Sequence, residues 1–320
     1  MDKRTLLKIS SCFIGSILVV VFLQLAAVGP NKQINHFVRI FPSHFFGAPK
    51  MVDLKNHNFY IAGLTEKSIY FGDYGDPVNI SRIDWNLSDY IKLNLHFPKG
   101  ESIRTAELHL SVDSPFFFIN NFSTGSILRG LISTPAVTLK QVHSFKISTS
   151  IFIPCSSGTF AVRTFDSKVK ENVLGKLSLD SSYIRLWPHL LEKPSGGFFT
   201  DDGLLRFDSV SGQFVYIYFY RNRFLCLDSN FNLRYIGQTL DTNAHAKIRV
   251  IAITSQNVTT IASPGFRVNR AACINQDWIF INSDLKADNE ENNIFNSYAV
   301  IDLYGLKDGR YHFSFYVPKK

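Results

Sequence analysis

The sequence predicts an all-β fold, most simply a β-propeller, after an N-terminal hydrophobic helix, and three observations favour it. Hydrophobic residues make up 45% and charged residues 19% of the 320 residues, a balance typical of a chain that folds around a core. The composition includes 29 Phe and 13 Tyr, and aromatic side chains fit the pleated, half-buried surface of a sheet. Short strand patterns then follow one another from residue 55 onward.

The first element is a hydrophobic segment over residues 9–29. Three positive charges precede it within residues 1–8, and the segment itself carries no charged residue. Its 21 residues are long enough to cross a hydrocarbon core as a helix, and basic residues before such a helix keep its N-terminus inside. We therefore predict a signal or anchor helix over residues 1–29, a single pass through the membrane, and a C-terminal domain in the periplasm or at the cell surface.

A cleaved signal peptide is the alternative interpretation of this segment. Ala27 and Gly29 supply small residues for only a poor cleavage site, and Pro30 directly afterwards should obstruct cleavage there. An uncleaved anchor is therefore the preferred prediction, whereas cleavage would make the protein secreted.

Residues 30–54 are predicted to form an extended linker, because Pro30, Pro42 and Pro49 occur there among scattered His and Phe. The folded domain is predicted over residues 55–318. Its strand patterns are short, rich in Ile, Val, Phe or Tyr, and bounded by turn-forming residues. The clearest are Phe59–Ala62, Ser68–Gly72, Phe214–Tyr220, Ile248–Thr254, Trp278–Asn282, Tyr298–Leu303 and Tyr311–Val317.

Residues 203–238 indicate how these strands are arranged. Four strand patterns are separated by three short turns, so consecutive strands are expected to pair antiparallel. A four-stranded meander of this length matches one blade of a propeller. The four predicted strands are Gly203–Asp208, Gln213–Tyr220, Arg223–Asp228 and Leu233–Gln238.

The same pattern recurs on both sides of this blade. Ser68–Asp73 and Val78–Asp84 are predicted as the third and fourth strands of an earlier blade. Tyr298–Leu303 and Arg310–Val317 are predicted as those of a later blade, and an Asp-Gly pair between them is a strong hairpin signal. At ~40–45 residues for each blade, residues 55–318 would hold roughly six blades.

The segment Tyr216–Asn222 and the turn Leu227–Asn230 carry a resemblance to a known group of proteins. With them, residues 55–318 resemble the six-bladed propellers of the TolB-like and NHL-like kind, including uncharacterised membrane-anchored members. The resemblance implies four-stranded blades around a central axis. Such proteins usually continue beyond the position of Tyr311–Val317 with a closing strand pair, so the blade number and the closure of the ring stay open. A two-sheet β-sandwich is the alternative fold.

The sequence lacks the common catalytic signatures, with no Gly-x-Ser-x-Gly, His-Glu-x-x-His, Walker or Gly-x-Gly-x-x-Gly motif. The acidic stretch 284–293 lacks EF-hand spacing and is interpreted as a solvated loop. Cys155, Cys226 and Cys273 form no Cys-x-x-Cys pair, and Cys226 is interpreted as a small buried residue of an apolar strand. We therefore predict neither a metal nor a cofactor.

Charge patterning adds little about partners. The net charge of +8 is spread along the chain without forming a block, which favours anionic neighbours only mildly. A basic stripe with interleaved aromatic residues is absent from the sequence, so nucleic acid is not predicted as a partner. The membrane, reached through residues 9–29, is the one partner that the sequence names.

The propeller prediction places a candidate binding surface on one rim. In a four-stranded blade, the loop from the second to the third strand and the connection into the next blade emerge on the same face, and such loops often carry function. The acidic loop 284–293 is expected there too. Alternatively, Arg221 and Asp202 only satisfy turn backbone groups or pair with each other. The candidate rim residues are Asp201, Asp202, Arg221, Asn222, Asp241, His245, Arg163, Glu66 and Lys67.

Three functions compete. A binding or scaffold module for an envelope protein, a glycan or a small molecule is preferred, because an anchor and a repeat scaffold are predicted without catalytic motifs. The alternative is an extracytoplasmic hydrolase or lyase that uses Asp201, Asp202, His245 and Arg221, but fold analogy alone cannot assign such chemistry. A purely structural envelope component is the third.

Overall fold

The computed structural model describes residues 4–5, 12–21, 35–43, 50–55, 58–98, 107–132, 136–144, 147–156, 158–181, 183–192, 200–248, 250–253, 258–261 and 266–319. Residues 12–21 of the predicted membrane segment are helical, whereas its residues 9–11 and 22–29 lie outside these ranges. No helix within the described ranges is both long enough and apolar enough to span a bilayer.

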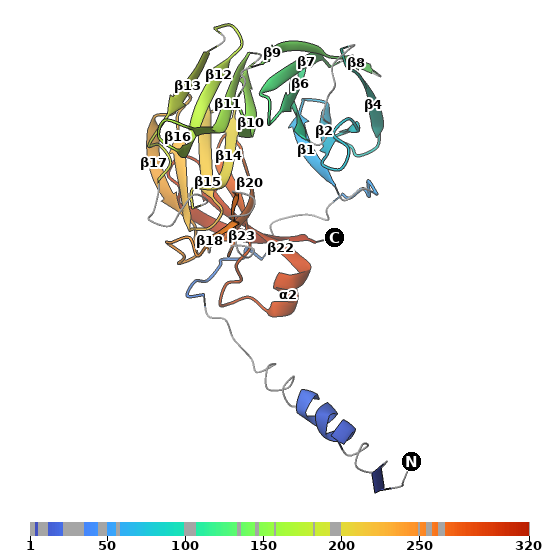
Figure 1. The fold of residues 1–320 in the computed structure, drawn as a ribbon, viewed down its shortest axis with the longest axis vertical. Helices are drawn as coiled ribbons and strands as arrows, with labels where there is room; N and C mark the ends of the chain where they lie inside the picture. The colour runs from blue at the N-terminus through green and yellow to red at the C-terminus, as the bar shows by residue number, and fades with distance from the viewer. Residues whose placement is uncertain are drawn as a thin grey trace.

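The described residues form five blades, each a run of four antiparallel strands (Figure 1). The first two blades are β1 (Phe59–Leu64), β2 (Ser68–Asp73), β3 (Ile80–Asp84) and β4 (Ile91–His96), then β5 (Leu108–Asp113), β6 (Phe116–Asn121), β7 (Ser126–Leu131) and β9 (Lys140–Ser144). The third is β10 (Thr149–Ser156), β11 (Thr159–Asp166), β12 (Glu171–Ser178) and β13 (Tyr183–Trp187). The last two are β14 (Gly203–Asp208), β15 (Gln213–Tyr218), β16 (Arg223–Leu227) and β17 (Leu233–Gln238), then β20 (Asn269–Ile274), β21 (Trp278–Ser283), β22 (Tyr298–Gly305) and β23 (Tyr311–Pro318).

The first strand of each blade is the innermost. Successive first strands are neighbours, because β1 contacts β5, β5 contacts β10, β10 contacts β14, and β14 contacts β20. This arrangement of sheets around an axis is that of a β-propeller. The alternative of two stacked sheets is therefore wrong.

The prediction of about six blades is also wrong, because the described residues form five. Dividing the domain length by a blade period treats connections as strands. In the connection over residues 239–268, the only strands among the described residues are those of a separate two-stranded hairpin, β18 (Val250–Ile253) and β19 (Val258–Ile261). A further part of the length lies in the loop before β22, which includes the short helix α2 (Asn292–Ser297).

Blades 1 and 2 are joined by an exchanged strand. After β7 the chain forms β8 (Ala136–Thr138), which pairs parallel with β4 of blade 1, and only then returns as β9 to pair with β7. The backbone N–H of Leu139 donates to the carbonyl of His96 at 2.9 Å. The chain therefore adds a strand to the edge of blade 1 before it completes the sheet of blade 2.

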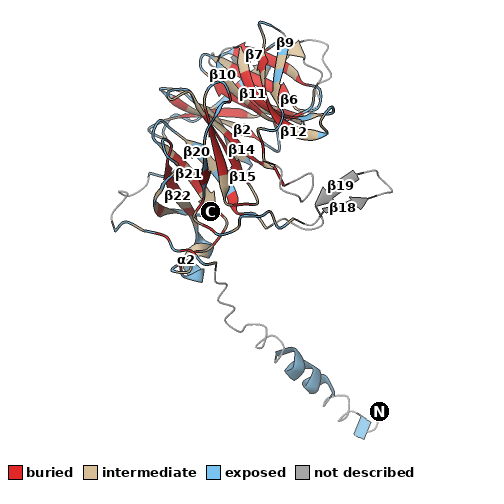
Figure 2. Cartoon of the chain, turned by 90° about the vertical axis from the view of Figure 1, so that its left-hand side faces the viewer, coloured by how far each residue is buried: buried red, intermediate tan, exposed pale blue. Residues whose placement is uncertain are grey.

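Buried residues lie along the strands of the blades (Figure 2), and apolar ones form cores between neighbouring blades. Leu110 and Phe117 of blade 2 lie in a core shared with blade 1, and Ile217 of blade 4 lies in a core shared with blade 5. Cys226 belongs to the second of these cores and is fully buried, which confirms the prediction of a small buried residue. Because each core is formed by two blades, neighbouring blades stabilise each other and fix the positions of the loops between their strands.

Part of the predicted linker packs on the propeller. Residues 35–41, here named the strap, lie against the fifth blade. The N–H of Ser314 in β23 donates to the carbonyl of Ile40 at 2.8 Å, and the ring of Phe41 stacks on that of Tyr316 at 4.6 Å. The strap has no helix or strand assignment and packs on the last blade.

Candidate functional site

In each blade the first strand starts and the second strand ends on the same face of the ring. We name this the top face; the name does not refer to the orientation in Figure 1. This face carries the loops from second to third strands and the connections into the first strands. The residue after the second strand donates a backbone hydrogen bond to the residue before the first strand in four blades. The pairs are Tyr74 to Asn58, Phe122 to Glu107, Phe219 to Asp202 and Asp284 to Val268.

The structure places most of the predicted rim residues on the top face. Asp201 and Asp202 directly precede β14, Arg221 and Asn222 form the turn between β15 and β16, and Asp241 and His245 follow β17. Arg163 lies within β11, and its side chain reaches the two aspartates.

Glu66 and Lys67 lie on the opposite, bottom face, so their placement on the rim is wrong. They form the turn between β1 and β2, the first and second strands of blade 1. The sequence prediction took Ser68–Asp73 as a third strand. Shifting a meander by one strand exchanges its two faces, which moved both residues to the wrong end of the blade.

Arg163 and the two aspartates form a bridge between blades 3 and 4. The Nη2 atom of Arg163 donates to Oδ1 of Asp201 at 3.1 Å and also to Oδ1 of Asp202. The Nδ2 atom of Asn172 donates to the carboxylate of Asp201 at 3.3 Å, and the hydroxyl of Tyr216 donates to the backbone carbonyl of Asp201 at 2.6 Å. Burial raises the pKa of Asp202, while Arg163 acts in the opposite direction.

Arg221 pairs with Glu192 and not with Asp202. Its guanidinium lies over the ring of Tyr218 at 3.7 Å, and its Nη2 donates to the carbonyl of Glu192 at 2.8 Å. The Glu192 carboxylate also binds Arg223 at 2.8 Å. Burial raises the pKa of Tyr218 to about 12, so its hydroxyl stays protonated and accepts the N–H of Glu192. The alternative interpretation, in which these residues satisfy backbone groups, therefore describes Arg221 well.

Asn222 and Asp241 tie the β15–β16 turn to the connection after β17. The Nδ2 atom of Asn222 donates to the carbonyl of Asp241 at 2.6 Å, and the carboxylate of Asp241 accepts the hydroxyl of Thr239 at 2.6 Å. His245 lies further along the same connection and is exposed. Of the predicted rim residues on the top face, His245 therefore presents its side chain most openly to a partner.

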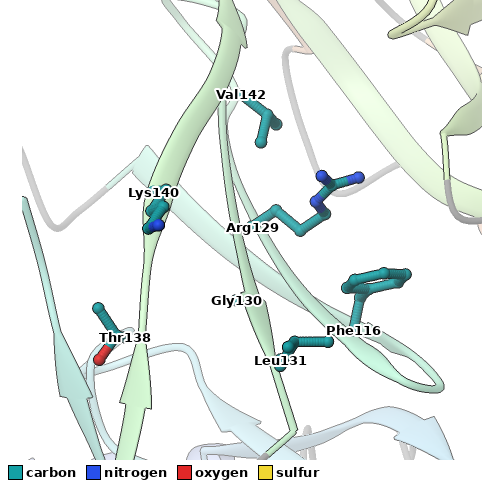
Figure 3. Close-up of a pocket in the computed structure, with 7 residues that line it drawn as sticks. All are labelled: Phe116, Arg129, Gly130, Leu131, Thr138, Lys140 and Val142. Carbon is teal, nitrogen blue, oxygen red and sulfur yellow. The ribbon is translucent and has the colours of Figure 1, made fainter.

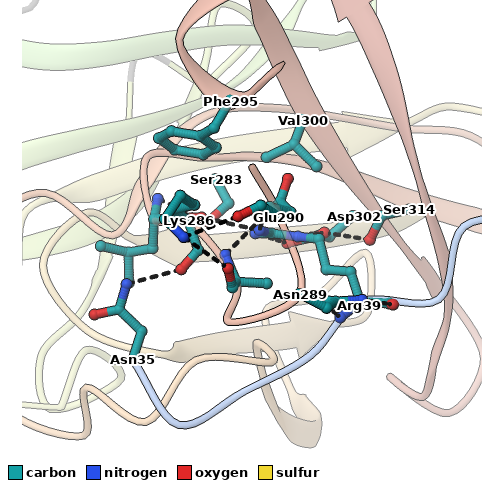
Figure 4. Close-up of polar contacts among 12 residues, drawn as sticks. Asn35, Arg39, Ser283, Lys286, Asn289, Glu290, Phe295, Val300, Asp302 and Ser314 are labelled. Atoms are coloured by element: carbon teal, nitrogen blue, oxygen red, sulfur yellow. Dashed lines mark hydrogen bonds and ion pairs between the residues drawn. The ribbon is translucent and has the colours of Figure 1, made fainter. Parts of the chain in front are cut away.

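A second charged cluster, which the sequence prediction missed, holds the strap to blade 5 (Figure 4). The Nε and Nη2 atoms of Arg39 donate to the two carboxylate oxygens of Asp302 at 2.7 and 3.0 Å, and Nη1 donates to Glu290. Burial alone would lower the pKa of Arg39, but the carboxylates of Asp302 and Glu290 outweigh it and raise the pKa. Ser314 also donates to Oδ1 of Asp302 at 2.6 Å, and Tyr316 donates to the other carboxylate oxygen of Glu290 at 2.7 Å.

Part of the acidic stretch 284–293 receives the strap. Its interpretation as a solvated loop fits the exposed residues 291–293 but not the buried residues 285, 287 and 290. Asp288 accepts the N–H of Asn35 at 2.8 Å, and Asn289 exchanges hydrogen bonds with the backbone of Arg39 at 3.0 and 2.8 Å. Glu290 is buried. Across the described ranges, no group of His, Cys, Asp or Glu is arranged to hold a metal ion.

Strands β6, β7 and β9 of blade 2 and the exchanged strand β8 line a pocket of about 480 Å³ (Figure 3). Its wall is mostly apolar, with two basic side chains. The guanidinium of Arg129 lies over the ring of Phe116 at 4.9 Å. A smaller pocket of about 340 Å³ lies beside the strap, between Asn35 and the loop before β22. The sequence indicated neither pocket, since strand exchange and strap docking create them. The first is lined by Phe116, Arg129, Gly130, Leu131, Thr138, Lys140 and Val142.

Comparisons with known proteins concern the fold. No protein-family model matches this chain, and no curated protein matches it. Several solved structures match at low identity. A member of the DUF4221 family from Bacteroides vulgatus has 10% identity and a TM-score of 0.47, over 82% of this chain and 81% of that chain. A chain of a nidogen/laminin complex has 11% identity and a TM-score of 0.46, over 79% and 76%.

TolB of Agrobacterium tumefaciens matches with 9% identity and a TM-score of 0.41, over 78% of each chain. At these identities no ligand, partner or activity of these proteins is carried over to this chain. The propeller itself rests on the five blades and the order of their first strands. The propeller that the sequence predicted is confirmed by the sheets themselves: the described residues form a β-propeller of four-stranded blades.

Proposed function

We propose that the chain is a membrane-anchored binding or scaffold module whose propeller lies outside the cytoplasm. The observation that carries the proposal is the strap. The chain is bound to the last blade from Asn35 onward, directly after the predicted membrane segment 9–29 and the five residues 30–34. A buried Arg39 held by two carboxylates makes that attachment firm.

The short connection limits where the propeller can sit. Five fully extended residues span at most roughly 17 Å. An anchor over residues 9–29 would therefore keep the fifth blade close to the bilayer surface. Since Asn35 contacts Asp288 and Thr242 on the top face, this proposal orients the top face towards the membrane. The partner would then be a protein or glycan of the envelope that lies at the membrane surface.

The hydrolase or lyase alternative receives less support from the top face. Asp201 and Asp202 share one guanidinium, and Asp201 also accepts from Asn172. A general acid or base needs its proton-carrying oxygen within reach of a substrate. Carboxylates that bridge two blades are better suited to rigid loop presentation, which a binding module needs.

Membrane anchoring is tested by fractionation of cells that produce the full chain or a variant lacking residues 9–29. We expect the full chain in the membrane fraction after washing at high salt, and the shortened chain in the soluble fraction. External protease should digest the propeller domain of the anchored chain without disruption of the membrane. Recovery of the full chain in the soluble fraction would contradict the anchor.

The binding face is tested with a photo-crosslinking amino acid at single positions in the full chain. His245 is exposed on the top face, and Val210 is 68% exposed in the β14–β15 turn on the bottom face. We expect a discrete envelope adduct from position 245 and none from position 210. Adducts of equal yield from both positions, or adducts from position 210 alone, would argue against the top face.

A further inference from the structure

The pocket of about 340 Å³ beside the strap lies on the top face. Its wall combines three parts of the chain that are far apart in sequence: the strap, the residues directly before β20, and the loop from β21 to β22 with its helix α2. Ligand pockets usually have volumes of about 300–1,000 Å³, so this one suits a small ligand or a single unit of a longer chain.

The two charged side chains of the described wall already have partners within the protein. The Nζ atom of Lys286 donates to the carbonyl of Glu290 at 2.9 Å. The Oδ2 atom of Asp284 accepts a hydrogen bond from Nε of Arg267 at 2.7 Å. One positive and one negative charge therefore cancel among the described lining residues, and the wall favours neither an anion nor a cation.

The open hydrogen-bonding groups of the pocket are amides. Asn292 and Asn296 are four residues apart in α2, so their side chains lie on one face of the helix. Neither amide has a hydrogen-bond partner within the described part of the chain. In the strap, Asn35 uses Nδ2 to donate to the carbonyl of Lys286 at 2.7 Å, which leaves its Oδ1 as an acceptor. An amide both donates and accepts, and it therefore matches a ligand whose groups also do both, as hydroxyls do.

Two phenyl rings, those of Phe266 before β20 and Phe295 in α2, line the pocket together with these amides. The Nζ atom of Lys319 donates to the carbonyl of Phe295 at 2.8 Å and lies 5.1 Å from the centre of its ring, which holds the ring in place. The electron-rich face of an aromatic ring attracts electropositive hydrogens. A sugar ring presents C–H groups on its faces and hydroxyls at its edge, so it can stack on a phenyl ring while its edge binds amides.

We propose that this pocket binds an uncharged sugar unit of a glycan, with the sugar ring against the phenyl rings and its hydroxyls against the asparagine amides. The pocket needs the strap in place, because Asn35 forms part of its wall. The inference deepens the proposed function by selecting a glycan from the partners considered for the top face. It rests on that function for the source of the glycan, which is the envelope.

The test measures binding of the methyl glycosides of glucose, galactose, mannose and N-acetylglucosamine by isothermal titration. It uses the purified full chain in a detergent whose headgroup contains no sugar. The variants are F295A, the double variant N292A with N296A, and the matched control N86A, whose exposed amide lies in the β3–β4 turn on the bottom face. We expect wild type and N86A to bind at least one glycoside with equal affinity. F295A should bind it about tenfold more weakly, and the double variant several-fold more weakly.

Two further ligands test the chemistry of the site. Sorbitol is an open-chain polyol without a ring to stack, so it should not bind measurably. Methyl glucuronide carries a carboxylate and should bind no more tightly than the best of the four glycosides. The proposal would be overturned by no binding of any glycoside to wild type, by wild-type affinity in the double variant, by sorbitol binding as tightly as a glycoside, or by tighter binding of the glucuronide. If F295A does not fold, the double variant gives the answer, because both of its positions are exposed.

A second readout follows the side-chain amide signals of Asn292, Asn296 and Asn86 by nuclear magnetic resonance during the glycoside titration. The first two should shift in wild type, whereas that of Asn86 should not, and the reverse pattern would contradict the site. Binding is measured on purified protein, so its failure would leave the fractionation result and the crosslinks from position 245 unchanged. Failure of the anchor would likewise leave glycoside binding intact.

Discussion

Blade 4 and blade 1 have the same four-stranded topology but very different surroundings. In blade 4, every residue from Phe214 to Tyr218 of β15 is fully buried, with blade 3 on one side and blade 5 on the other. In blade 1, no residue of β1 is buried, and Ile61 and Leu64 are 63% and 53% exposed. The strand β1 has close contacts with β2 and β5, whereas β14 contacts β10, β15 and β20.

The difference teaches that a blade derives its stability from its neighbours. A sheet of four short strands buries little by itself. Blade 4 lies between two blades and shares a core with each, whereas a terminal blade shares a core with one neighbour. The fifth blade, which is also terminal, is supplemented by the strap, whose Phe37 joins Val268 and Leu285 in a small core. Blade 1 has no comparable cover among the described residues.

The largest effect is expected from truncating a buried side chain in blade 4. Phe214 is fully buried, stacks on Phe207 at 4.4 Å and meets the edge of Phe231 at 4.8 Å. Phe214→Ala should lower the free energy of unfolding by about 3–5 kcal/mol, measured by urea denaturation of the full chain. The matched change Phe71→Ala in blade 1 removes a half-buried ring and should cost about half as much or less. Equal losses would contradict the comparison.

The strap gives the next largest effect. Arg39→Ala leaves Glu290 and Asp302 buried without their cation, so we expect a loss of about 3 kcal/mol. Hydrogen exchange should show increased opening of the strap and of the 284–291 loop. Arg267→Ala is the control, because its pair with Asp284 is partly solvent-exposed and should contribute less than about 1 kcal/mol. An unchanged exchange pattern in the Arg39 variant would show that the strap is held by other contacts.

The two blades also explain how far the sequence could predict the fold. Residues 203–238 were predicted with strand limits within two residues of β14–β17, since a strand buried on both faces is a continuous apolar run between clear turns. In blade 1 the strands were recognised but numbered wrongly. A meander has no local mark that tells a second strand from a third, so Glu66 and Lys67 were assigned to the wrong face.

The candidate site was predictable only where its residues are close in sequence to the strands that position them. Asp201 and Asp202 were placed on the correct face because they precede a recognised first strand. The partner of Arg39 in β22 is separated from it by 263 residues, and no periodicity relates the two. An isolated arginine among apolar residues, together with an unexplained acidic loop, was the only available signal.

A smaller effect is expected from His109, whose ring stacks on that of Tyr60 of blade 1 at 4.7 Å. In the unfolded chain His109 takes up a proton near its usual pKa of 6.5, whereas in the folded chain it does so at about 4. The unfolded state therefore binds more protons between these values, so stability falls as the pH drops from 6.5 to 4 and levels off below. The contribution is roughly 3 kcal/mol, at ~1.4 kcal/mol for each unit of pKa.

His109→Phe keeps a ring between Tyr60 and Phe122 and should remove this contribution. Unfolding curves at several pH values, in buffer without phosphate or carboxylates, would give the difference between the variant and wild type. Parallel dependence on pH in the two proteins would mean that His109 is not the group responsible.

The smallest effect is expected on the exposed face of blade 1. Ile61→Thr alters a side chain that is 63% exposed on an innermost strand, and surface substitutions of this kind change stability by about 0.5 kcal/mol or less. Ile217→Thr in β15 is the matched change at a fully buried position and should cost several times more, because it places a hydroxyl in the core between blades 4 and 5. If Ile61→Thr instead cost as much as Ile217→Thr, the side of blade 1 that exposes Ile61 would be covered in solution. The contrast between a middle and a terminal blade would then be lost.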